Sequence, residues 1–157
     1  MGLDMYLNKK TYTQRWSHQE KEKTFEVTVK RGGKKFSIIQ PDRVSYVIER
    51  VGYWRKFNAL HRWFVENVQK GEDDCGEYSV EREQLRELLK DLSKVIDNPK
   101  EAKNALPTAS GFFFGGTEYD EFYFQKVKET AELIESLLKE AEADPEYLGE
   151  FFYTSSW

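Results

Sequence analysis

The sequence predicts an α+β domain, a mainly antiparallel sheet covered by three helices. Stretches that alternate between apolar and polar residues occupy the first third of the chain, as half-buried strands require. Apolar residues at three- and four-residue intervals then dominate residues 53–143, as amphipathic helices require. Strands followed by helices are typical of an antiparallel sheet with helices packed against it.

Three single strands are expected in the sheet. Residues 2–8 alternate Leu3, Met5 and Leu7 with polar neighbours, and residues 44–51 repeat this pattern after a break at Pro41-Asp42. The closing run, 150–157, is rich in aromatic residues and predicts a C-terminal strand that returns to the sheet.

A hairpin is expected around Gly32-Gly33. A two-residue turn at these glycines places Val29 opposite Phe36 and Val27 opposite Ile38. Both pairs then share one face, as a half-buried sheet requires. The hairpin is therefore assigned to the same covered sheet.

Three amphipathic stripes predict helices, and two of them have a cap. Ser79 is expected to cap the second helix, and Asp120 to form an approximate capping box with Thr117 in the third. Asp144-Pro145 should end the third helix. The predicted helices span about 53–69, about 80–96, and from near 117 to 144.

Composition predicts one soluble domain, 1–157, in the cytoplasm. No apolar run approaches the roughly 18 residues that span a bilayer, and the first residues lack the pattern of a secretion signal. The single cysteine, Cys75, fits a reducing compartment. No membrane association is expected.

Charge is unevenly distributed along the chain. Residues 1–70 hold 15 Lys/Arg and 7 Asp/Glu, a balance of +8, whereas residues 71–157 hold 9 and 21, a balance of −12. Such asymmetry can indicate a charged partner. The favoured interpretation is simpler: the acidic helices have a solvated face.

The first helix has an unusual histidine. His61 lies within the apolar stripe, with Trp54 on the same side and Asn58 at its border. His61 is expected to be a buried residue bonded to a carbonyl or carboxylate. The alternative places it in a pocket beside Trp54 and Asn58 as a donor or general base.

Trp63 points away from His61 on the predicted helix. A tryptophan on the polar side of a helix must cover another element or contact a partner, and the sequence leaves both open. It is the candidate for outside contact.

An acidic loop, 71–78, joins the first two helices and contains Asp74, Glu77 and Tyr78. A solvated loop is favoured over a pocket wall or a cation site, because the acids lack EF-hand spacing. With two histidines and one cysteine in the chain, a structural zinc site has too few ligands. Neither a metal nor a cofactor is expected.

The segment 107–121 is rich in glycine and phenylalanine and ends with Tyr119 and Asp120 near a helix start. Backbone N–H groups there suit an anion, but no lysine follows the glycines and the acids would repel phosphate. A plain turn is expected. Nucleophile-elbow, zinc-protease and dinucleotide motifs are absent from the sequence.

Several short sequence segments resemble those of a family of short uncharacterised proteins encoded by bacteria and their phages. They are the MGLDMYL start, VGYWRK at 51–56, DDCGEY at 73–78, GFFFG at 111–115, TEYD at 117–120 and the closing SSW. The resemblance covers nearly the whole chain. It implies a mobile-element origin and no established activity.

The leading functional hypothesis is a non-enzymatic binding protein, such as a phage accessory or counter-defence factor. It would hold a small ligand, or a host protein with a basic surface, through the residues Trp54, Asn58, His61, Trp63, Asp74, Glu77, Tyr78, Tyr119 and Asp120. The alternative is a small hydrolase or nucleotide-modifying enzyme with His61 as base and nearby carboxylates. Nucleic-acid binding through Lys30, Arg31, Lys34 and Lys35 is disfavoured, because a charged turn tip is ordinary.

Overall fold

A computed structural model describes residues 1–147 and 149–157, and it confirms the α+β class. The main sheet has four strands in the order β4-β1-β6-β5, and every neighbouring pair is antiparallel. Its strands are β1 (Asp4–Tyr12), β4 (Tyr46–Arg55), β5 (Tyr78–Val80) and β6 (Glu150–Ser156).

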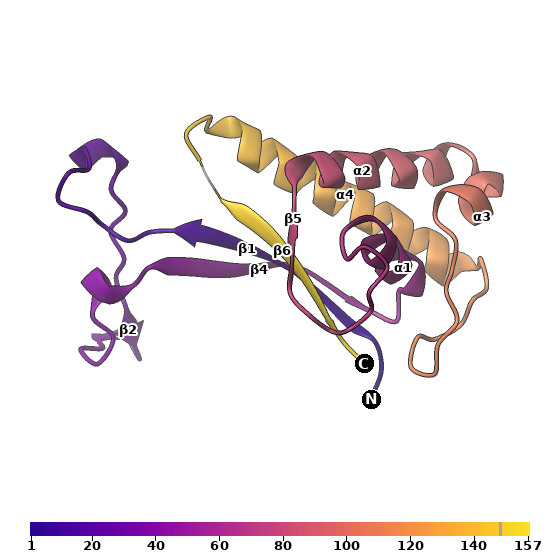
Figure 1. Ribbon diagram of the computed structural model, residues 1–157, viewed down its shortest axis with the longest axis horizontal. Coiled ribbons are helices and arrows are strands. Elements are labelled where there is room, and N and C mark those ends of the chain that lie inside the picture. The colour runs from indigo at the N-terminus through magenta and orange to yellow at the C-terminus, as the bar shows by residue number, and fades with distance from the viewer. Residues whose placement is uncertain (148) are drawn as a thin grey trace.

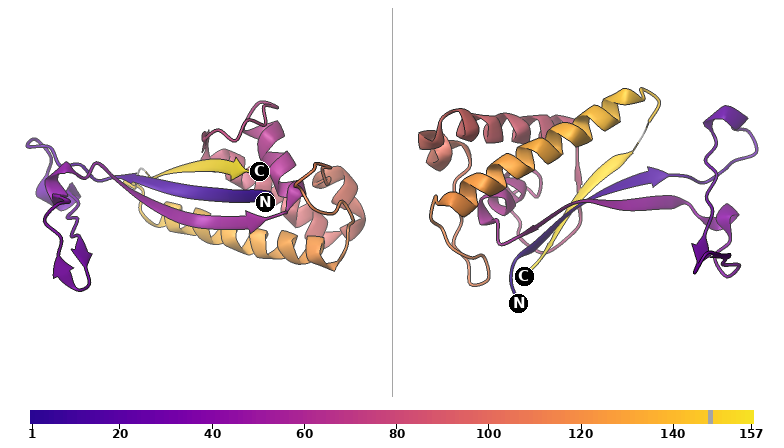
Figure 2. Two further views of the ribbon diagram at one scale, coloured as in Figure 1. Left: turned by 90° about the horizontal axis from the view of Figure 1, so that it is seen from below. Right: turned by 180° about the vertical axis from the view of Figure 1, so that it is seen from behind.

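The helices lie against one face of this sheet, and the opposite face is open to view (Figures 1 and 2). In the described residues, none of them is both long enough and apolar enough to cross a membrane. The α-helices are α1 (Asn58–Asn67), α2 (Arg82–Asp97), α3 (Ala102–Ala105) and α4 (Glu121–Ala143), with short 3-10 turns at Lys21–Lys23, Pro41–Arg43 and Pro99–Glu101.

The predicted C-terminal strand is confirmed, and it is central to the sheet. β6 pairs with β1 from Asp4↔Ser156 to Lys10↔Glu150, and its other edge pairs with β5. The two ends of the chain therefore lie side by side (Figure 1).

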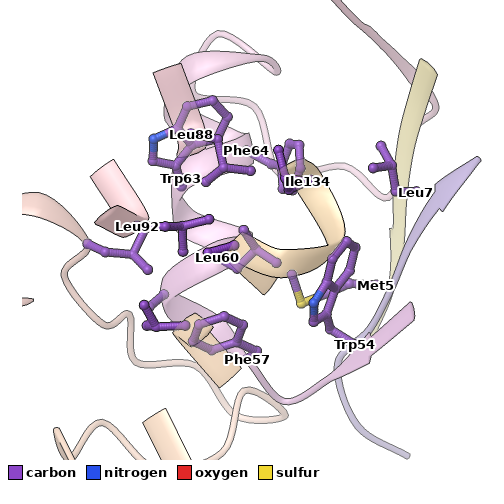
Figure 3. Packing of buried hydrophobic residues seen from close by; sticks show 14 of the residues in the cluster. Met5, Leu7, Trp54, Phe57, Leu60, Trp63, Phe64, Leu88, Leu92 and Ile134 are labelled. Carbon is purple, nitrogen blue, oxygen red and sulfur yellow. The ribbon is translucent and has the colours of Figure 1, made fainter. Parts of the chain in front are cut away.

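The core lies between the sheet and the helices (Figure 3). Met5 and Leu7 of β1, and Leu3 just before it, alternate in the sequence and are fully buried on the helix side, as their spacing predicted. The α2 residues Leu88 and Leu92 belong to the same buried cluster, and Figure 3 shows Leu60 and Phe64 of α1 between them and the strand residues.

The boundary predicted between strand and helix near residue 52 is wrong. β4 continues to Arg55, so Trp54 lies on a strand rather than in the stripe of α1. The strand can continue because the register shifts at Leu7/Asn8, which accommodates an extra residue before Gly52. The indole of Trp54 then enters the core and donates a hydrogen bond to Thr130 of α4 (2.9 Å).

Neither of the two predicted helix caps forms as expected. The third helix begins at Glu121 rather than near Thr117, and the predicted capping box of Thr117 with Asp120 is wrong. Asp120 is itself the N-cap of α4, since its side chain accepts a hydrogen bond from the N–H of Tyr123. Ser79 does not cap α2. It lies on β5, and Glu81 caps α2 through a reciprocal capping box with Gln84.

The predicted hairpin forms, but it does not join the covered sheet. β2 (Lys30–Arg31) and β3 (Lys34–Lys35) make a separate two-stranded ribbon, and the N–H of Phe36 donates to the carbonyl of Val29 as expected. Ile38 is 75% exposed rather than half-buried. The cause is topological: residues 13–45, called the arm below, project beyond the ends of β1 and β4, away from the helices (Figure 1).

The bulge gives a stability prediction. A Cβ at Gly52 would lie 2.5 Å from the ring of Trp54, whose indole is held by Thr130. We expect Gly52→Ala to lower the free energy of unfolding by about 1–3 kcal/mol in urea denaturation. Gly116→Ala is the control, because nothing lies within 4 Å of its added methyl. Equal stability of the two variants would contradict this account.

Candidate functional site

The short helix α1 positions the first candidate side chains because it is enclosed on more than one side. Its Phe64 ring stacks on Tyr153 of β6 (centroids 3.9 Å apart), and its Trp63 indole donates to Asp91 of α2 (3.0 Å). Trp63 is only 5% exposed. The sequence left two roles open for Trp63, and the structure shows the first: it covers another element, α2. Trp63 is not available for the outside contact for which it was the candidate.

His61 is buried on α1 and hydrogen-bonded through both ring nitrogens. Its Nδ1 lies 2.7 Å from the hydroxyl of Tyr153, and its Nε2 lies 3.0 Å from a carboxylate oxygen of Asp73. The prediction of a buried histidine bonded to a carboxylate is therefore confirmed. A buried polar ring with two partners avoids the cost of an unsatisfied group.

The partners of His61 assign the direction of these hydrogen bonds. Burial raises the pKa of Tyr153 well above its ordinary value, so the phenol keeps its proton and can donate to Nδ1 of His61. Nε2 of His61 then carries the proton that faces Asp73, an assignment made from the partners. Tyr153 is fully buried, so its hydroxyl is not presented to solvent.

Asp73 links His61 to the end of the chain. One carboxylate oxygen accepts from His61, and the other accepts from the indole N–H of Trp157 (3.1 Å). Phe114 packs edge-on against both rings, with centroid separations of 5.1 Å to His61 and 6.0 Å to Trp157. Neither Asp73 nor Trp157 is among the predicted site residues.

Asn58 anchors the glycine-rich loop. Its amide nitrogen donates to the carbonyls of Phe114 (3.0 Å) and Gly116 (2.8 Å), and its oxygen accepts from the N–H of Ala109 (3.0 Å). All three interactions are with backbone atoms. This side chain fixes the path of the loop over α1.

The acidic loop is closed by its own hydrogen bonds. Asp74 accepts from the N–H of Gly76 (2.8 Å) and from the phenol of Tyr78 (2.9 Å). The Gly76 N–H and the Tyr78 phenol lower the pKa of Asp74, and the same bond to Asp74 raises the pKa of Tyr78. Glu77 forms an ion pair with Lys10 of β1. Within 1–147 and 149–157, no group of three His, Cys, Asp or Glu side chains could hold a metal ion.

Tyr119 and Asp120 also have structural partners. The hydroxyl of Tyr119 accepts from the N–H of Thr108 (3.1 Å), and Asp120 caps α4. The structure thus brings together Asn58 and His61 on α1. The side chains of Asp74, Glu77 and Tyr78 have other hydrogen-bond or ion-pair partners and are exposed at least in part.

A shallow hollow of about 200 Å³ lies beside Asn58, between Lys56, Glu118 and Asp120, with Phe122 and Tyr123 among its walls. A second, of about 280 Å³, lies over Trp63 and Asp91. Drug-sized ligands usually occupy about 300–1,000 Å³. His61 lines neither of these two hollows.

The sequence prediction also missed the exposed surface of the arm and its adjoining strand ends. Every residue from 14 to 50 is exposed or half-buried, although the alternation of 24–38 and 44–51 predicted buried faces. The excess of Lys and Arg within this stretch could have indicated an exposed surface. From the sequence alone, its basic hairpin is instead interpreted as an ordinary charged turn.

Comparison of the chain with protein-family models, with curated proteins and with solved structures finds no match.

The hydrogen bonds of His61 give a second stability prediction. Tyr153→Phe removes the donor to Nδ1 and leaves a buried nitrogen without its partner. We expect the free energy of unfolding to fall by about 1–3 kcal/mol. Tyr46→Phe is the matched control, since this tyrosine is 50% exposed, and it should change stability by less than about 0.5 kcal/mol. An unchanged stability in Tyr153→Phe would refute the structural role of the bond.

The Asp74 loop gives a pH prediction. Because the folded pKa of Asp74 is lowered, its contribution to stability is present above its unfolded-state pKa and is lost as pH falls through its folded pKa. In Tyr78→Phe, carboxyl NMR should show a pKa of Asp74 above the wild-type value, yet still lowered by the Gly76 N–H. Identical titration curves for the two proteins would show that the Tyr78 phenol does not lower the pKa of Asp74.

Proposed function

We propose that this chain is a non-enzymatic binding protein that holds a macromolecular partner on the arm and the adjoining ends of β1 and β4. One observation carries the proposal: this region has no core of its own, yet it presents many large hydrophobic side chains to solvent. Those that are exposed are Tyr12, Trp16, Phe25, Ile38, Ile39, Tyr46, Val47 and Ile48.

Such a surface is typical of a binding site. Clusters of exposed apolar side chains often mark a site that another molecule covers, and three of these side chains are in contact, Trp16 and Tyr46 each with Tyr12. Tyr12 and Tyr46 face each other across the strand pair, with ring centroids 5.2 Å apart, and Ile48 follows two residues along β4 on the same face. The rigid β1–β4 ribbon therefore displays part of this surface in a fixed geometry.

The polar side chains of the body support binding over catalysis. His61, Asn58, Asp74 and Asp120 each have internal hydrogen-bond partners. The alternative of a hydrolase or nucleotide-modifying enzyme needs His61 and two carboxylates beside one pocket. One carboxylate, Asp73, contacts His61, and the buried imidazole lines neither hollow described above.

The acidic helices give weaker support for a partner with a basic surface. Several of their carboxylates already pair with neighbouring cations, as in the contacts of Arg86 with Glu83 and Glu142. The resemblance to bacterial and phage proteins supports a phage accessory or counter-defence role as the setting for this binding. That role stays a prediction.

Site-specific photocrosslinking tests the proposal. A benzophenone amino acid in place of Tyr46 should form adducts with a partner in a lysate of infected bacteria, and unlabelled wild-type protein should compete. The same probe at Lys128, exposed on α4, is the matched control. A further Ile48→Asp change should reduce the adducts formed at position 46, because it places a charge in the apolar contact. Adducts at position 128 alone, or none at either position, would contradict the proposal.

A further inference from the structure

We propose that the arm and the ring cluster at its base bind single-stranded nucleic acid. The inference rests on the proposed function and names the partner of the same surface. The ring cluster is defined as Tyr12, Trp16 and Tyr46. Two features of the surface carry the inference: uncompensated positive charge in the β2–β3 hairpin, and aromatic rings exposed in fixed positions.

The hairpin brings like charges together. Lys30 lies directly opposite Lys35, and Arg31 lies directly opposite Lys34. Like charges at directly opposed positions destabilise a strand pair. Gly32 and Gly33 hold the strands in this register through a tight turn with positive φ at both residues. A polyanion seated on the hairpin would remove this repulsion, so its binding stabilises the local fold.

The acidic residues of the arm are too few to neutralise its positive charge. Residues 13–45 contain eight Lys/Arg and four Asp/Glu, a balance of +4. In the described part of the chain, Lys23 is the one cation of the arm that forms an ion pair. Phosphate groups spaced along a strand are anions that many separated cations can contact at once.

The ring cluster offers aromatic surfaces on which bases can stack, which cation–phosphate contacts alone do not provide. The Trp16 indole donates to the hydroxyl of Tyr12 (2.9 Å), and Tyr12 packs edge-on against Tyr46. All three rings are between 40% and 50% exposed. Rings held in place with an open face are the stacking platforms that single-stranded nucleic acid uses.

The same combination continues along the open face of the sheet. Tyr6 of β1 and Tyr53 of β4 lie side by side, with centroids 5.4 Å apart, and the guanidinium of Arg50 lies 4.4 Å from the centroid of Tyr6. A base needs an exposed ring face, and a duplex keeps its own base faces stacked. The aromatic content therefore favours a single strand over a duplex.

Fluorescence anisotropy with labelled 12-nucleotide dT and U strands, and with a 12-base-pair duplex, tests this proposal on the full chain. The hairpin variant is Lys30→Gln, Arg31→Gln, Lys34→Gln and Lys35→Gln. Its control makes the same charge change on the helical body, with Lys90→Gln, Lys100→Gln, Lys103→Gln and Lys128→Gln. Four phosphate contacts predict about 50-fold weaker binding at 200 mM than at 50 mM salt.

The wild type and the control should bind the single strands alike, and the hairpin variant should lose both affinity and about three units of the salt slope. Trp16→Leu should weaken single-strand binding at least about fivefold and change its salt slope little. Circular dichroism spectra and melting temperatures establish that each variant is folded.

Three results would overturn the inference: tighter binding to the duplex, equal losses in the hairpin and control variants, or binding to phosphatidylserine vesicles without binding to nucleic acid. Photocrosslinking to a protein at position 46 without any nucleic-acid binding would also overturn it, while leaving the proposed function intact. If neither the photocrosslinking nor the anisotropy experiment detects binding, both the proposed function and this inference are wrong.

Discussion

The two hydrogen bonds of His61 are the constraint on which the body of this protein depends. They join α1 to β6 through Tyr153 and to the acidic loop through Asp73, and Asp73 in turn holds Trp157 at the end of the chain. Asn58, one turn earlier on α1, fixes the glycine-rich loop over the same region. Segments far apart in sequence are thereby held around one short helix.

This arrangement separates a closed body from an open arm. In the body, polar groups at the predicted site form internal hydrogen bonds, and many of the acids on α2 and α4 pair with cations. In the arm, cations lie opposite cations and rings face solvent. The groups that can gain contacts from a partner, the unpaired cations of the described chain and the exposed rings, are therefore concentrated in the part of the chain that has no core.

Local patterns in the sequence predicted much of the fold, because strand alternation and helix stripes depend on near neighbours. Trp54 was misplaced because only pairing with β1 shows that the strand continues past Gly52. Trp63 was misjudged because a helix enclosed by two layers has more than one buried side. The contact between Asp73 and Trp157 joins residues 84 positions apart, which no local spacing indicates. The arm escaped prediction because alternation suggests a buried face without showing that anything lies against it.

The most direct test of this division is an NMR titration of ¹⁵N-labelled protein with a single-stranded oligonucleotide. The account predicts amide shift changes concentrated in residues 12–50, with the amides of α2, α4 and the acidic loop at 71–78 unchanged. Shift changes concentrated in those helices or in that loop, with the arm unaffected, would contradict it.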